Sequence, residues 1–267
     1  MENTNNIKYK IALCQMMVDE DKEKNFIKAS EMINEAASNG AEFVCLPEIW
    51  NGPYEMDKFA SFAEPDTGQS VELMRELANN NNIYLIGGSI PEKDNNQTYN
   101  TSFVFNRSGD VIAKHRKMHL FDIDVEGGIY FKESDFFTAG EGITTFDTEY
   151  GKIGVAICFD VRFPEMHIET ARAGAHIIFL PGAFNMTTGP AHWDTLIKSR
   201  ALDNQIYFAA CSPARNLAST YHAFGHSSIA TPWGDYCGTT DANESIVYGI
   251  IDRGYENKVR SELPLML

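Results

Sequence analysis

Long hydrophobic runs and clusters of positive charge are both missing from this chain. No apolar stretch approaches the roughly 18 residues that a membrane-spanning helix requires, so we expect no membrane partner. The chain has 267 residues, a formal net charge of −15, and a single dense basic run at residues 114–117. Because duplex binding needs clustered Lys and Arg, we also expect no nucleic-acid partner.

Cysteine pairs with the spacing of a metal site are missing as well. No Cys-x-x-Cys pair indicates zinc, and no His, Asp or Glu cluster has ligand spacing, so we expect no metal. The first ten residues lack the basic and apolar regions of a signal peptide. Scattered cysteines in odd number are typical of reduced thiols in a cytoplasmic protein, which is the location we predict. The five are Cys14, Cys45, Cys158, Cys211 and Cys237.

Segments with the periodicity of strands and helices alternate along the chain. The pattern predicts helices at 21–39, 70–80, 164–173, 190–204 and 255–261. It predicts strands at 7–16, 42–46, 83–90, 99–106, 110–117, 144–148, 152–159, 176–180, 206–212, 227–231 and 245–251, with a turn at 232–235 between the last two. Helices between strands cover the faces of mixed sheets, so we predict an α/β fold. No linker is visible, which favours one domain over residues 1–267.

The most informative segment of the chain is residues 154–165. An apolar run that predicts a buried strand ends at Cys158, and after a short turn Pro164 and Glu165 begin a predicted helix. The thiol then lies at a strand end near free backbone N–H groups, where a thiolate is favoured and an oxyanion could bind. Cys158 is therefore a candidate acyl-transfer nucleophile, and the alternative is a small core residue.

Two charged residues follow other predicted strands. Glu48 lies between apolar neighbours, which should raise its pKa and suit a general base, although it could be a helix-capping group. Lys117 ends a basic strand and is by default a solvated cation. His119 and His192 are candidates for a Cys–His pair, but neither has a partner spacing that distinguishes it. Strand ends can converge on one sheet edge, where α/β proteins bind ligands.

The combination of these segments resembles the nitrilase superfamily of carbon–nitrogen hydrolases over essentially the whole chain. Residues 46–48, 116–122, 154–165 and 181–193 carry the resemblance, as separate motifs in the right order. Residues 181–193 and 211–216 look most like the ω-amidase branch, which hydrolyses the terminal amide of α-keto acid amides such as α-ketoglutaramate and α-ketosuccinamate.

The resemblance implies a fold, an assembly and a catalytic set. The fold is an αββα sandwich, dimerised to αββα–αββα, and the catalytic set needs no cofactor. Carried over by position, Cys158 is the nucleophile, Glu48 the general base and Lys117 the oxyanion stabiliser. Glu133 matches a second glutamate, which would keep Lys117 protonated by an opposite charge.

A keto-acid amide also carries a carboxylate, which needs its own site. Arg162 is the best donor because a guanidinium grips a carboxylate with two hydrogen bonds, and Thr188 could add a hydroxyl. The alternative for Arg162 is a structural ion pair with Glu165 or another acidic residue of a loop. We therefore predict a thiol amidase that converts a small carboxylate-bearing amide to acid and ammonia through a cysteine thioester. The alternatives are hydrolysis of an N-carbamoyl amine, deaminated glutathione or a nitrile, or a non-catalytic metabolite-binding role.

Overall fold

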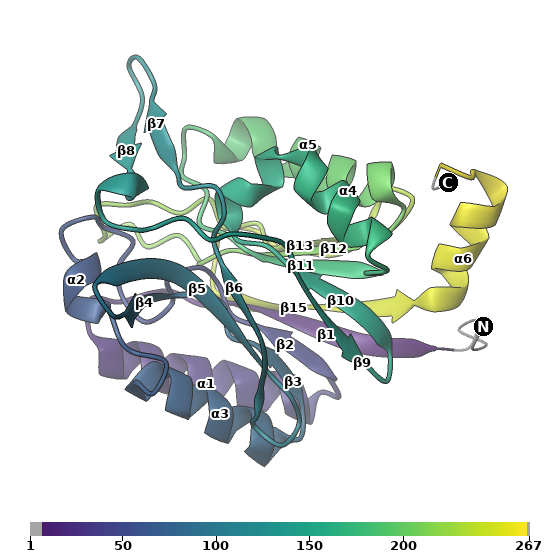
Figure 1. Ribbon diagram of the computed structural model, residues 1–267, viewed down its shortest axis with the longest axis horizontal. Helices are drawn as coiled ribbons and strands as arrows, with labels where there is room; N and C mark the ends of the chain where they lie inside the picture. Colours follow the sequence, from purple (N-terminus) through teal and green to yellow (C-terminus); the bar gives the residue numbers. More distant parts are fainter. Residues whose placement is uncertain (1–6, 266–267) are drawn as a thin grey trace.

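The computed structural model describes residues 7–265, in which two β-sheets stack face to face between two layers of helices (Figure 1). Helices α1 (Lys22–Ser38) and α3 (Gln69–Asn81) cover the outer face of the first sheet. Helices α4 (Pro164–Arg172) and α5 (Gly189–Asn204) cover the outer face of the second. Two further helices are α2 (Phe59–Phe62) and α6 (Arg253–Glu262).

Both sheets are mixed, as the alternation of helices and hairpins predicts. The first has the order β15–β1–β2–β3–β5–β4, with β6 also paired to β5. Its strands are β1 (Lys8–Gln15), β2 (Phe43–Cys45), β3 (Tyr84–Ile86), β4 (Ile90–Asp94), β5 (Gln97–Phe105), β6 (Val111–Arg116) and β15 (Ser245–Asp252). The second has the order β14–β13–β12–β11–β10–β9. Its strands are β9 (Thr144–Thr148), β10 (Gly151–Val155), β11 (Ile177–Pro181), β12 (Tyr207–Cys211), β13 (Ser228–Ala230) and β14 (Tyr236–Thr239).

Alternate side chains of one strand enter different cores. In β1, Ile11 and Leu13 belong to the core between the two sheets, whereas Ala12 and Cys14 belong to the core shared with α1 and α3. This follows from the two-residue period of a strand. Because both faces are buried, the strand sequences are almost continuously apolar. The layering is the αββα sandwich that the resemblance implies.

The strand predicted at 83–90 is wrong, because the chain turns inside it. β3 ends at Ile86 and β4 begins at Ile90. Gly88 has a φ of 57°, and a Cβ at this position would lie 2.1 Å from the carbonyl oxygen of Pro47. Only glycine fits this close approach. The turn therefore packs directly against the segment that carries Glu48.

The predicted pairing around the turn at 232–235 is also wrong. This turn connects β13 to β14, a short strand that the sequence did not reveal. β15 instead joins the first sheet, where it pairs antiparallel with β1 from Lys8–Asp252 to Gln15–Ser245. A strand's hydrophobic pattern reports burial but not its partner, so the sequence could not assign β15.

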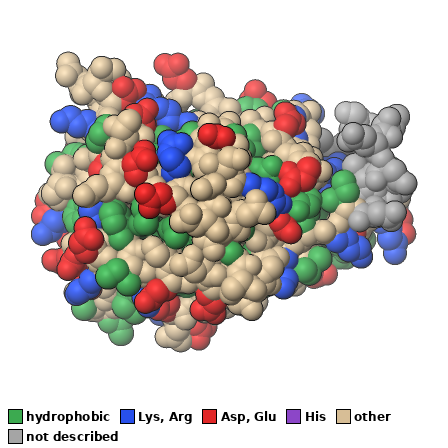
Figure 2. All heavy atoms as spheres, turned by 90° about the horizontal axis from the view of Figure 1, so that it is seen from below, with side chains coloured by type: hydrophobic (Ala, Val, Ile, Leu, Met, Phe, Trp, Pro, Cys, Tyr) green, Lys and Arg blue, Asp and Glu red, His purple; other side chains and the backbone are tan. Residues whose placement is uncertain are grey.

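Small elements lie in the segment predicted to be loop-rich. They are the hairpin of β7 (Asp122–Asp124) and β8 (Tyr130–Lys132) and a 3₁₀ turn at Glu133–Asp135. Among the described residues, none of the helices is both long and apolar enough to cross a membrane. On the face seen in Figure 2, Lys and Arg side chains are interspersed with Asp and Glu rather than gathered into one basic patch.

Candidate active site

Glu48 follows strand β2 and is buried, with 1% of its surface exposed. Its Oε1 accepts hydrogen bonds from Lys117 Nζ and Asn100 Nδ2, both at 2.9 Å, and its Oε2 accepts one from the Ala183 N–H at 2.7 Å. The next residue, Ile49, has a φ of 49°, a left-handed conformation that is rare for a β-branched side chain. Such strain is common at functional sites. The carboxylate is therefore a fixed acceptor and not a helix cap.

Lys117 follows strand β6 and has no exposed surface, so its default interpretation as a solvated cation is wrong. Its ammonium lies 2.9 Å from Glu48 Oε1 and 2.8 Å from Glu133 Oε2. Although burial alone lowers the pKa of Lys117, the charges of Glu133 and Glu48 outweigh it and raise that pKa above its ordinary value. The lysine is therefore a permanent cation in the site.

Glu133 begins the 3₁₀ turn after β8 and is fully buried beside Lys117. Its Oε1 accepts a hydrogen bond from the Tyr54 hydroxyl at 2.6 Å, and its Oε2 accepts one from the Phe121 N–H at 2.7 Å. These donors hold the carboxylate in place without neutralising it. Glu133 can thus orient the ammonium, as the resemblance implies.

Cys158 does not end a strand, contrary to the prediction from its sequence. β10 stops at Val155, and Cys158 is the first residue of a 3₁₀ turn, Cys158–Arg162. Its φ is 45°, and a Cβ at Gly182 would lie 3.2 Å from its Cα. The turn lifts the cysteine out of the sheet. Pro164 does begin α4, as predicted.

The electrostatics of the thiol also differ from the prediction. Burial, followed by the negative charge of Glu48, raises the pKa of Cys158 well above its ordinary value, and Lys117 only partly opposes this. Burial likewise raises the pKa of Glu48, as predicted, against the lowering effect of Lys117. The resting thiol is therefore protonated and needs a neighbouring base, for which Glu48 is placed.

The two histidine candidates have other partners. His119 Nδ1 lies 2.8 Å from Asp160 Oδ1, and its ring stacks on Phe163 with centroids 3.5 Å apart. His192 Nδ1 lies 3.2 Å from Arg162 Nη2. Within residues 7–265, no group of three or more His, Cys, Asp or Glu side chains could hold a metal ion.

Arg162 is half-buried next to the site, and among the described residues no carboxylate lies within ion-pair distance of it. The alternative of an ion pair with Glu165 is therefore wrong. The guanidinium lies over the rings of Phe159 and Phe184, at 5.5 and 5.2 Å from their centroids. Its Nε is buried without a hydrogen-bond partner, and burial lowers its pKa. The group is a cation without a counter-charge.

Thr188 is buried just before α5. Its N–H and hydroxyl both donate to Asn185 Oδ1, at 2.9 and 3.3 Å. The long hydroxyl bond leaves this side chain free to exchange partners. Asn185 Nδ2 is also buried without a hydrogen-bond partner, and no sequence signal pointed to this residue.

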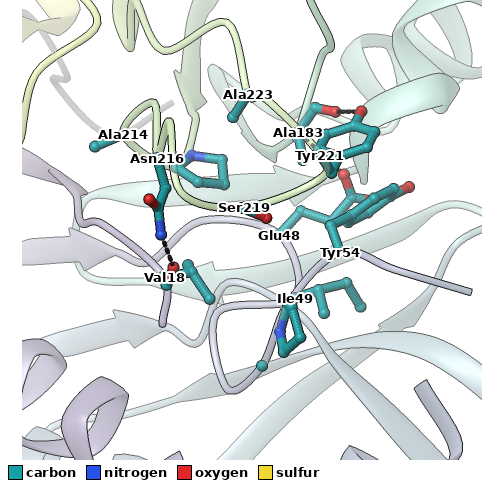
Figure 3. A pocket seen from close by; sticks show the side chains of 13 residues that line it. Val18, Glu48, Ile49, Tyr54, Ala183, Ala214, Asn216, Ser219, Tyr221 and Ala223 are labelled. Carbon is teal, nitrogen blue, oxygen red and sulfur yellow. Dashed lines mark hydrogen bonds between the residues drawn. The ribbon is translucent and has the colours of Figure 1, made fainter. Parts of the chain in front are cut away.

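A narrow pocket leads to this cluster. Figure 3 shows Glu48, Tyr54 and Tyr221 at one end of it and Val18, Asn216 and Ala214 at the other. The Tyr221 hydroxyl donates to the Ala183 carbonyl, and the Tyr54 and Tyr221 rings lie 4.7 Å apart. The sequence pointed to neither tyrosine, because single aromatic residues carry no positional signal.

The tertiary structure thus unites residues far apart in the chain. Glu48, Lys117 and Glu133 form one ion-paired cluster, and the charges of all three act on the Cys158 thiol. A buried base, a permanent cation and a thiol next to a narrow pocket suit nucleophilic attack on a carbonyl carbon.

Comparisons with known proteins agree with this geometry. The family model described as carbon-nitrogen hydrolase matches residues 10–261. The "Omega-amidase, chloroplastic" of Arabidopsis thaliana is 48% identical over 97% of this chain and 71% of its own length. "Omega-amidase NIT2-A" of Xenopus laevis is 46% identical over 97% of this chain and 94% of its own.

A solved structure extends the likeness to the whole fold. The crystal structure of Saccharomyces cerevisiae Nit3, described as a member of branch 10 of the nitrilase superfamily, superimposes with a TM-score of 0.92 and 41% identity. The match covers 100% of this chain and 98% of that chain. The protein is therefore a member of the carbon–nitrogen hydrolase family, within the nitrilase superfamily.

Proposed function

We propose that this hydrolase is a thiol amidase of the ω-amidase type. Its substrate is a small amide that also carries a carboxylate, such as the α-keto acid amide α-ketoglutaramate, and its products are the acid and ammonia. The observation that carries the proposal is the buried cluster of Glu48, Lys117 and Glu133 around the Cys158 thiol. Relatives 46–48% identical to the chain bear the name omega-amidase, which supports the same reaction.

In the first step, Glu48 removes the proton from the Cys158 thiol as the sulfur attacks the amide carbonyl carbon. The pKa values of both groups are raised, so the proton stays on sulfur until the substrate is present. Transfer to a positioned carboxylate of raised pKa is efficient near neutral pH. The new C–S bond converts the carbonyl oxygen to an oxyanion.

Lys117 stabilises that oxyanion, helped by the backbone N–H of Phe159, the residue after the nucleophile. The ammonium is held by Glu133 and Glu48 and is charged before the substrate arrives, so no reorganisation is needed during the reaction. The stabilisation of the oxyanion by Lys117 is strongest in a site without water, where charge interactions are weakly screened.

The oxyanion then collapses and the C–N bond breaks. Glu48 returns its proton to the nitrogen, so that ammonia leaves and a thioester remains on Cys158. Water, deprotonated by Glu48, attacks this thioester, the C–S bond breaks, and the sulfur recovers its proton. One water is consumed, and one acid and one ammonia are released.

Arg162 and Thr188 are proposed to bind the substrate carboxylate. The guanidinium of Arg162 has no ion-pair partner among the described residues, and its Nε lacks any partner. A half-buried cation without a counter-charge is unfavourable, and a carboxylate would satisfy it. The Thr188 hydroxyl, held at 3.3 Å by Asn185, could turn to the same anion.

Ammonia release from α-ketoglutaramate is the direct test. The purified protein is expected to release ammonia, and Cys158→Ala is expected to reduce release to the level of a reaction without enzyme, because no other group can form the thioester. Ammonia is measured continuously with a coupled assay. The circular dichroism of the variant should match that of the original protein, since only the sulfur of this buried residue is removed and its Cβ remains.

The same assay decides between the alternatives. Activity only with N-carbamoyl amines, deaminated glutathione or nitriles would replace the proposed substrate but keep the Cys158 chemistry. Inactivity with every substrate, together with uniformly slow alkylation of all five cysteines, would indicate a non-catalytic binding protein.

Replacing Arg162 by alanine should reduce kcat/KM for α-ketoglutaramate about 10- to 100-fold, because a hydrogen-bonded charge pair is lost. The activity on a neutral amide of similar length should change little. Steady-state kinetics on the two substrates measure this difference. Arg172→Ala, at an exposed position on α4, is the matched control. An equal loss on both substrates would instead make Arg162 a structural residue.

We further propose that two copies form the αββα–αββα homodimer implied by the resemblance, in a reducing compartment such as the cytoplasm and without a cofactor. All five cysteines are free, which supports a reducing environment. Sedimentation equilibrium should give twice the chain mass of 29.9 kDa, and a mass equal to one chain would contradict the dimer.

A further inference from the structure

A buried carboxylate that the proposed reaction does not use lies two residues after the nucleophile. Asp160 has no exposed surface. Its Oδ1 accepts the His119 N–H at 2.9 Å and lies 2.8 Å from the Nδ1 of the same residue. Its Oδ2 accepts the Ile157 N–H at 3.0 Å and lies 3.1 Å from His115 Nε2. Four donors thus converge on one side chain.

These bonds join the two segments that carry the reactive groups. Ile157 immediately precedes Cys158, and His119 lies two residues after Lys117, so one carboxylate ties the cysteine turn to the lysine segment. The link is long-range in sequence, since Asp160 and His119 are 41 positions apart. A shift of either segment would break at least one of these bonds.

Asp160 also holds the strained backbone of the nucleophile. Its own N–H donates to the Ile157 carbonyl at 3.0 Å, while its side chain accepts the Ile157 N–H. Ile157 is thereby held through both its N–H and its carbonyl, directly before Cys158, whose φ is 45°. A left-handed conformation is unfavourable for a residue other than glycine and persists only where its surroundings fix it.

Each of the two histidine side chains has a further contact that holds it in place. His115 Nδ1 lies 3.0 Å from Thr144 Oγ1, and the His119 ring lies nearly parallel to Phe163, at 9°. Although burial raises the pKa of Asp160, hydrogen bonds from His115 and His119 outweigh it and lower that pKa below its ordinary value. The carboxylate is therefore a permanent anion and not a proton carrier in the reaction.

We propose that Asp160 is a positioning residue, which sets the Cys158 sulfur and the Lys117 ammonium relative to each other by bonding to the neighbours of both. This inference rests on the proposed function, in which sulfur attacks the carbonyl while Lys117 holds the oxyanion. Both groups must meet the same carbonyl, one at carbon and one at oxygen. A displacement of about 1 Å between such groups can cost about 10²-fold in rate.

The test is Asp160→Asn, which keeps the shape and removes one acceptor. Each carboxylate oxygen faces a backbone N–H, of His119 or of Ile157, so the amide nitrogen must face one of them whichever way it is turned. One link is therefore lost. We expect kcat to fall about 10²-fold with KM little changed, and alkylation of Cys158 by iodoacetamide, followed by mass spectrometry, to slow.

Asp147→Asn is the matched control, because it removes an exposed ion pair to Lys152 and should leave kcat and alkylation unchanged. A folded Asp160→Asn variant with the original kcat would overturn the proposal. So would a raised KM with an unchanged kcat, because Asp160 would then act in substrate binding.

If Asp160→Asn does not fold, His119→Phe decides the matter. Phenylalanine keeps the stack on Phe163 and the backbone N–H but removes the 2.8 Å contact to Oδ1. A smaller loss of kcat at constant KM is expected, and an unchanged kcat would overturn the proposal. Alkylation needs no amide substrate, so an inactive original protein whose Cys158 alkylates faster than in the variant would contradict the amidase function alone.

Discussion

Glu48→Gln is expected to lower kcat by about 10²–10⁴-fold while leaving the protein folded. In the proposed mechanism the carboxylate takes the thiol proton, returns it to the departing ammonia and activates the water that follows, and an amide can do none of these. Ammonia release measures the loss of kcat, and circular dichroism shows whether the variant is folded. Activity close to that of the original protein would remove Glu48 as the base.

The fold should survive because the amide can be accommodated. A glutamine oxygen can keep the bond to the Ala183 N–H, now 2.7 Å long. Its nitrogen can donate to Asn100 Oδ1, which is buried without a partner, once that amide turns over. Lys117 keeps Glu133 as its counter-charge. Glu256→Gln, a buried carboxylate of α6, is the control that should retain kcat.

The pH dependence of kcat/KM is a second test of Glu48 as the general base. Burial raises the pKa of its carboxyl above the ordinary 4.5. Below that raised pKa the group is protonated and cannot accept the thiol proton, so kcat/KM should fall at a pH above the usual carboxylate range. The residual activity of Glu48→Gln should lack this acidic limb.

Lys117→Met is expected to damage both stability and catalysis. It leaves Glu48 and Glu133 as buried carboxylates without a cation, and removing one partner of a buried ion pair typically costs about 3–5 kcal/mol. Loss of an oxyanion donor typically lowers kcat by about 10²–10³-fold. Urea unfolding measures the loss of stability, and steady-state kinetics measure the loss of kcat.

The loss of stability should depend on pH with a definite sign. Lys117 opposes the rise in the pKa of Glu48 that burial causes, so without the lysine that pKa lies further above its unfolded value and the folded state binds more protons. The variant should therefore be relatively more stable at low pH and lose stability as pH rises through the raised pKa of Glu48. Lys152→Met, which removes an exposed pair with Asp147, should cost at most about 1 kcal/mol. An equal loss in both variants would contradict the buried cluster.

The prediction from sequence was most successful where the signal is local. Apolar runs and helical periodicity predicted most strands of both sheets and the four helices that cover them, because burial imposes these patterns directly. The strand ends at Glu48 and Lys117 followed from the same patterns. The roles of these residues came from the resemblance, and they await the experiments above.

Local patterns failed where the outcome depended on distant partners. Lys117 is buried because carboxylates 69 and 16 positions away neutralise it. Cys158 looked like a strand end, because its apolar neighbours are buried whether they form a strand or a 3₁₀ turn. Asp160 carried no signal at all, since its four donors come from two separate segments.

The sequence by itself determined the period of most elements, the α/β class, and the set of motifs whose resemblance to the family implied the αββα layers. Only the tertiary structure decided that β15 joins the first sheet, that the resting thiol is protonated, and that Asp160 links the cysteine to the lysine. The reason is physical. Periodicity and burial depend on residues that are neighbours in the sequence. Strand pairing, buried charge and pKa depend on groups that only folding brings within a few ångströms.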